Sequence, residues 1–80
     1  MPIRLDSDLD FLRTNIEFGE VERLDNGSLI FLAQCPNASY PERLAFQNEA
    51  NRMFARLGWC LKNIVVDHGM LDADLIKMPD

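Results

Sequence analysis

The chain has 80 residues, an apolar fraction of 48% and a formal net charge of −5. Its size predicts a single small domain over residues 1–80, and the apolar fraction is typical of a folded chain rather than a disordered one. No apolar run approaches the roughly 18 residues that a membrane-spanning helix needs, and no basic segment followed by an apolar one signals export. We therefore expect a cytoplasmic protein with no membrane partner, in which Cys35 and Cys60 remain free thiols.

The segment that begins at Ser7 predicts a first helix of about nine or ten residues, which is short enough to depend on packing. Ser7 is a favourable N-cap residue, and acids at positions 8 and 10 suit the positive end of the helix dipole. The apolar stripe of this helix consists of Leu9, Leu12 and Ile16.

The strongest turn signal is the sequence Asp-Asn-Gly-Ser at residues 25–28. Asn-Gly suits the two central positions of a type I′ turn, where both φ angles are positive. The turn therefore predicts a hairpin between strands at residues 18–24 and 29–34. The first strand is charged and contains Gly19, which suits a sheet edge. Residues 29–33 are apolar without alternation, which predicts a central strand covered on both faces.

Residues 39–57 predict one long amphipathic helix. Ser39 and Glu42 match a capping box, in which each side chain bonds a free N–H at the helix start. Pro41 falls in the first turn, where its missing N–H costs little, and Gly58 supplies a left-handed stop. The apolar side chains that recur on one face are Phe46, Ala50, Met53, Phe54 and Leu57.

Residues 61–66 form a β-branched run that predicts a third strand. Beyond it, Leu71, Leu75 and Met78 recur at helical spacing, which favours a short final helix, with a weak strand at residues 75–76 as the alternative. The predicted fold class is α+β in the order α-β-β-α-β. It has a three-stranded, mostly antiparallel sheet, one long helix packed on a face, and short terminal helices. The second face needs a cover, for which the first helix, the C-terminal tail and a second copy in a homodimer are the candidates.

The sequence predicts no catalytic, metal or cofactor site. His68 follows Asp67, but neighbouring residues at a strand end point to opposite sides, so we expect Asp67 not to orient the imidazole of His68. Cys35, Cys60 and His68 include no closely spaced pair of metal ligands. The four glycines are isolated from one another, so they form no phosphate-binding loop.

Charge is spread unevenly along the chain. Residues 1–25 carry seven acids and three bases, whereas residues 42–62 carry two acids and four bases. Nucleic-acid phosphates require clustered bases, so most of this chain repels them, while a partner with a basic patch is attracted. The charge distribution therefore favours a protein partner with a basic surface over direct binding of nucleic acid.

Together these observations predict a non-enzymatic, acidic protein-binding domain. A small acidic chain of this kind suits an inhibitor or adaptor, such as phages and mobile elements encode, that occupies a basic surface of nucleic-acid machinery. The expected partner-binding residues are Asp8, Asp10, Glu20 and Glu22.

The alternative hypothesis is a small nucleic-acid-binding domain that uses the polar face of the helix at residues 40–57. Arginine and asparagine side chains on a helix can contact base edges and phosphates. The residues that would do so are Asn48, Asn51, Arg52, Arg56 and Lys62.

Overall fold

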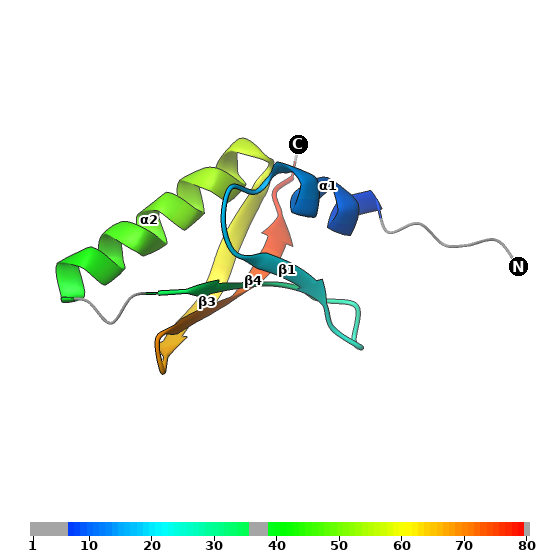
Figure 1. The fold of residues 1–80 in the computed structure, drawn as a ribbon. Helices are drawn as coiled ribbons and strands as arrows, with labels where there is room; N and C mark the ends of the chain where they lie inside the picture. Colours follow the sequence, from blue (N-terminus) through cyan, green and yellow to red (C-terminus); the bar gives the residue numbers. More distant parts are fainter. Residues whose placement is uncertain (1–6, 36–38, 80) are drawn as a thin grey trace, which may run out of the picture.

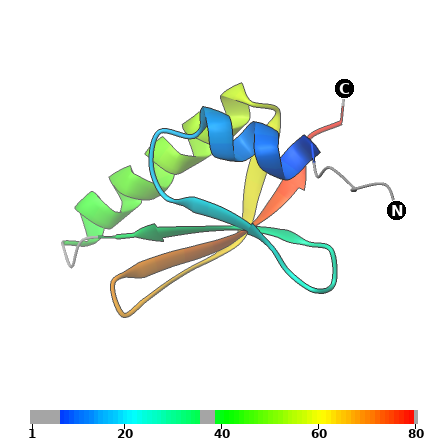
Figure 2. The ribbon, with the colours of Figure 1, turned by 45° about the vertical axis from the view of Figure 1, so that its right-hand side comes forward.

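The computed structural model describes residues 7–35 and 39–79, and it has an α+β fold with one four-stranded antiparallel sheet. Its elements in chain order are α1 (Ser7–Asn15), β1 (Glu20–Arg23), β2 (Leu29–Gln34), α2 (Tyr40–Arg56), β3 (Trp59–Asp67) and β4 (Met70–Lys77). The strands lie in the order β1-β2-β4-β3 (Figure 1). Figure 2 shows α1 and α2 on the same side of this sheet.

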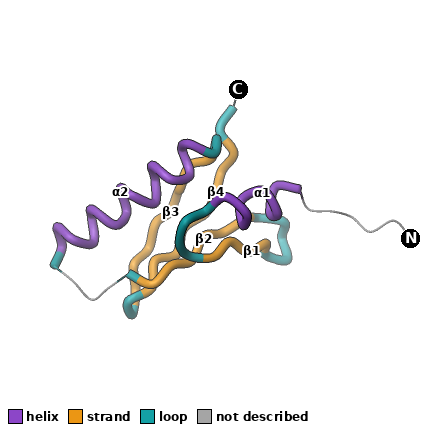
Figure 3. The backbone as a smooth tube through the Cα atoms, turned by 45° about the horizontal axis from the view of Figure 1, so that its top comes forward, coloured by secondary structure: helices purple, strands orange, loops and turns teal. Residues whose placement is uncertain are grey.

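The last strand corrects the prediction of a three-stranded sheet with a C-terminal helix. β4 is a strand, and it lies between β2 and β3 and pairs antiparallel with both (Figure 3). Leu71 and Leu75 are four residues apart, a spacing that fits a helix and also one face of a strand. Ala73 lies between them in sequence and is buried with them, so this segment follows the two-residue period of a strand.

The hairpin is present, but its turn differs from the predicted type. Asn26 does not have the positive φ that a type I′ turn requires, and only Gly27 of the turn is left-handed, with φ of 90°. The N–H of Leu24 donates to the carbonyl of Ser28, so three residues form the loop. A three-residue loop closed by a left-handed glycine is another common hairpin connection. β1 is also shorter than predicted, while β2 has the predicted bounds.

The two helices confirm the predicted apolar stripes. Leu12 of α1 and Met53 and Phe54 of α2 are buried, and Gly58 follows α2 with φ of 86°. Phe46 and Leu57, which the stripe also predicts to be buried, pack against the core but are only partly buried. The capping box is wrong in detail, because the hydroxyl of Ser39 donates to the Glu42 carboxylate at 3.0 Å and caps no main-chain N–H. Neither described helix is long and apolar enough to cross a membrane.

Phe31 of β2 is at the centre of the core. Its ring is fully buried and meets the ring of Phe54 edge to face, with centroids 4.8 Å apart. The ring of Phe18, from the connection between α1 and β1, packs on two other rings. Its centroid lies 6.0 Å from that of Phe31 and 5.3 Å from that of Phe46 on α2. One aromatic cluster therefore joins α2, the α1–β1 connection and β2, which is one of the two inner strands.

The prediction that β2 is covered on both faces is not met by the described helices. Leu29, Phe31 and Ala33 belong to the core beneath the helices, whereas Ile30 and Leu32 alternate with them and point to the other side. α1 packs on the same side as α2, and the C-terminal segment is a strand within the sheet. We call the side of the sheet away from α1 and α2 the open face.

Replacing Phe54 by alanine should lower the free energy of unfolding by about 3–5 kcal/mol, because it removes a large buried ring that packs on Phe31. Leu44→Ala on the same helix is the control, since Leu44 is 43% exposed and its loss should cost under about 1 kcal/mol. Urea titration followed by circular dichroism measures both. Equal costs for the two variants would contradict the core assignment.

Candidate partner-binding surface

The open face is defined by the pairing of the strands, because residues directly opposite one another in a sheet point to the same side. Ile30 of β2 stands opposite Glu22 of β1 and Asp74 of β4. One step along the sheet, Leu32 stands between Glu20 and Asp72 in the same way. The paired strand positions on this face are Glu20, Glu22, Ile30, Leu32, Gln34, Cys60, Lys62, Val65, Asp67, Met70, Asp72, Asp74 and Ile76.

The open face carries an excess of negative charge. Its paired positions in the described strands hold five acids and one base, Lys62. Four of the acids form two columns, one on β1 and one on β4, with the two apolar residues of β2 between them. These four acids are Glu20, Glu22, Asp72 and Asp74. The surface is therefore an apolar strip with carboxylates along both sides.

Apolar side chains interrupt what would otherwise be a polar surface. Ile30 is buried, with 8% of its surface exposed, and Leu32 is partly exposed, although neither lies under a described helix. Val65, Met70 and Ile76 on the neighbouring strands are all more than two-fifths exposed. An antiparallel sheet with a simply solvated face carries polar residues at such positions. The open face therefore combines apolar contact area with charge.

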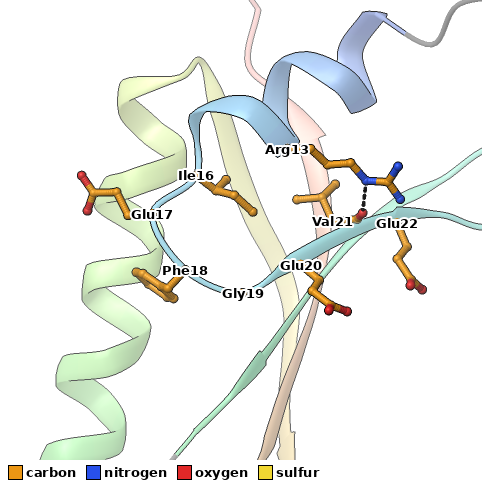
Figure 4. Close-up of a pocket in the computed structure, with 8 residues that line it drawn as sticks. All are labelled: Arg13, Ile16, Glu17, Phe18, Gly19, Glu20, Val21 and Glu22. Carbon is orange, nitrogen blue, oxygen red and sulfur yellow. Dashed lines mark hydrogen bonds between the residues drawn. The ribbon is translucent and has the colours of Figure 1, made fainter.

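β1 is held in place so that its acids project from the open face. The Nε of Arg13 on α1 donates to the carbonyl of Val21 at 3.0 Å, and Val21 is buried beneath the helix. Figure 4 shows the side chains of Glu20 and Glu22 on the opposite side of the strand from Val21, pointing away from α1. Gly19, immediately before, has φ of 79°, and a Cβ there would lie 2.4 Å from the ring of Phe31.

A bulge in β3 supports the acids of β4. Between Lys62 and Val65 the register shifts, so that two residues of β3 oppose one of β4. The first of these, Asn63, is left-handed with φ of 54°, and its side-chain N–H donates to the Asp74 carboxylate at 2.8 Å. This hydrogen bond fixes one carboxylate oxygen of Asp74 and leaves its negative charge in place.

The structure separates the four predicted partner-binding acids into two groups. Glu20 and Glu22 lie on the open face, together with Asp72 and Asp74, which sequence reasoning missed. Asp8 and Asp10 belong to α1, on the other side of the sheet. The carboxylate of Asp8 lies 3.6 Å from the ammonium group of Lys77.

The residues of the alternative hypothesis are also divided. Asn48, Asn51, Arg52 and Arg56 lie on α2, and the Arg52 guanidinium pairs with Glu49 of the same helix at 2.8 Å. Lys62 lies on the open face, so the sheet stands between it and α2. The structure thus places the base from β3 apart from the polar side of α2.

His68 does contact Asp67, contrary to the expectation from sequence. The Nδ1 atom of His68 lies 2.9 Å from a carboxylate oxygen of Asp67. The reason is that His68 is left-handed, with φ of 52°, so the strand alternation ends there. Asp67 is the last residue of β3 and His68 begins the turn to β4, and both are exposed. The free thiols lie elsewhere, Cys35 in the core and Cys60 on the open face.

Comparison of the chain with models of protein families, with curated proteins and with solved structures finds no match.

The charge of the open face should oppose stacking of two copies through their sheets, because like charges would meet at the contact. In light scattering at physiological salt, we expect a mass near 9.2 kDa at high micromolar concentration. The variant E20Q/E22Q/D72N/D74N keeps the shapes of the side chains but removes four charges. We expect its mass to rise with concentration, because the apolar strip is no longer protected.

The matched control is D10N/E17Q/E42Q/E49Q, which removes four charges outside the open face. We expect this control to remain monomeric. A wild-type dimer, or equal association of the two variants, would show that the acids of the open face do not govern self-association.

Proposed function

We propose that the chain is a non-enzymatic protein-binding domain whose open face occupies a basic, partly apolar surface of a partner. The observation that carries the proposal is the placement of four carboxylates on both sides of Ile30 and Leu32. Carboxylates on neighbouring strands offer acceptors to Lys and Arg side chains, and the partly exposed Leu32 supplies apolar contact area between them. The predicted homodimer is not part of the proposal, because its most direct contact would pair acids with acids.

The arrangement of the acids supports a partner that arrives by electrostatic attraction. Charges of one sign on one face speed the encounter with an oppositely charged surface, and they disfavour acidic partners. Since Asn63 holds Asp74 by a hydrogen bond, part of the surface is ordered before any partner binds. We infer that the charge of the open face makes it specific for basic proteins. The apolar residues of this face add contact area.

Proteins that bind nucleic acids are the partners with the most extensive basic surfaces, because they must neutralise phosphates. An acidic sheet face that covers such a surface would exclude the nucleic acid. The role that fits is therefore an inhibitor or adaptor of nucleic-acid machinery, of the kind that phages and mobile elements encode. The charge of the open face and the small size of the chain support this role.

The proposal is tested by capture from a lysate on beads that carry the chain at low density. We expect a set of basic proteins to bind wild type and D10N/E17Q/E42Q/E49Q and to be lost with E20Q/E22Q/D72N/D74N. Bound proteins are identified by mass spectrometry, and binding should weaken as salt rises. If both variants capture the same proteins as wild type, the open face is not the binding surface.

The nucleic-acid alternative is tested by anisotropy titration with labelled duplex and single-stranded probes at physiological salt. We expect no binding in the micromolar range, because acids outnumber bases and Lys62 stands apart from α2. Binding that falls steeply with salt, and that Arg52→Ala and Arg56→Ala reduce, would favour the alternative instead.

A further inference from the structure

We propose that the partner segment recognised by the open face is a short amphipathic helix with basic side chains on both flanks of its apolar stripe. This inference rests on the proposed function, and it specifies the shape of the partner. The helix would lie along β2, with its apolar stripe on the partly exposed Leu32 and over Ile30, which is buried with 8% of its surface exposed. Its lysines and arginines would reach the acids of β1 on one flank and those of β4 on the other.

The distance between the two acid columns matches the diameter of a helix. β1 and β4 are both neighbours of β2, so the two acid columns stand two strand spacings apart, about 10 Å. A helix with its side chains is about 10–12 Å across. Long basic side chains lie with their stems along apolar surface and their charged ends outward, which suits a strip that is apolar in the middle and acidic at the sides.

The spacing along the strip also matches. Ile30 and Leu32 are two residues apart on one strand, a distance of about 6.8 Å, which is close to one helical turn of about 5.4 Å. Residues at i and i+4 of a partner helix can therefore lie over these two positions in turn, with most of the contact on Leu32, because only 8% of Ile30 is exposed. The six residues of β2 span about 20 Å, the length of roughly 13 helical residues.

An extended partner segment fits this face less well than a helix. β2 is paired with β1 on one side and with β4 on the other, so its main-chain groups are engaged within the sheet. Extended peptides gain affinity chiefly by adding to a free strand edge. A helix satisfies its own main chain, so it can lie on the face of a sheet and contribute side chains alone.

A second copy of the chain fits less well on grounds of charge. The open face carries five acids and one base at its paired strand positions, and a symmetric contact would bring the same charges together. A helix with basic flanks instead brings opposite charges to each acid column. Charge complementarity therefore favours the basic amphipathic helix over self-association.

The test uses three labelled synthetic peptides of about 16 residues with identical leucine and lysine content. One has a leucine stripe at helical spacing with lysines on both flanks, one alternates leucine and lysine as a strand would, and one is scrambled. Anisotropy measures the affinity of each for the full chain, and circular dichroism measures the helix content gained on mixing. The protein variants are wild type, E20Q/E22Q/D72N/D74N, D10N/E17Q/E42Q/E49Q and Leu32→Ser.

We expect the helical peptide to bind wild type at least tenfold more tightly than the other two and to gain helix content on binding. E20Q/E22Q/D72N/D74N should weaken its binding at least tenfold, and D10N/E17Q/E42Q/E49Q should leave it within twofold of wild type. Leu32→Ser should weaken the helical peptide more than the scrambled one, which a purely electrostatic contact would not show.

Three outcomes would overturn the inference. If all three peptides bind equally and all depend on the acids of the open face, the helical partner is wrong while the proposed function stands. If the alternating peptide binds best, an extended segment is the partner. If wild type forms a dimer that the helical peptide cannot dissociate, the open face belongs to a second copy, and the proposed function fails with the inference.

Discussion

The edge-to-face packing of Phe31 against Phe54 is the contact on which the rest of the structure depends. It places α2 on one side of β2, and Phe18 holds the α1–β1 connection on the same side. The ring of Phe31 also requires Gly19, where a Cβ would collide with it. Once both helices lie on the side of Phe31, the alternation of the strands assigns every other residue to the open face.

The fold could be predicted where one pattern excluded the others. The apolar stripe of α2, its stop at Gly58 and the bounds of β2 were all readable from sequence. The strand at residues 70–77 could not be predicted in this way, because the spacing of Leu71 and Leu75 fits both the helical period and the two-residue period of a strand. The decisive signal was the strict alternation from Leu71 to Leu75, which a helix would not bury on one side. The sequence also could not predict that no helix covers the second face of β2, because that depends on the side of the sheet on which α1 packs.

Two of the four acids beside Ile30 and Leu32 could be predicted from the sequence. Charge along the chain pointed to Glu20 and Glu22, but it also pointed to the acids of α1, because linear density does not reveal the side of the sheet on which a residue lies. Asp72 and Asp74 were missed as a consequence of the mistaken helix. Had residues 70–77 been predicted as a strand next to β2, the register of the two strands would have placed both acids beside Ile30 and Leu32.

A solvated face accounts for the acids but not for their apolar neighbours. On the open face, β1 and β4 carry charged residues beside β2, as is usual for strands with one solvent-exposed face. β2 instead carries Ile30 and Leu32 on this face. Apolar residues on an open sheet favour aggregation, and flanking charges are a usual protection against it. Protection alone would be simpler with polar residues on β2. The presence of both the apolar strip and the acids is consistent with a surface that does not self-associate and that binds a basic partner.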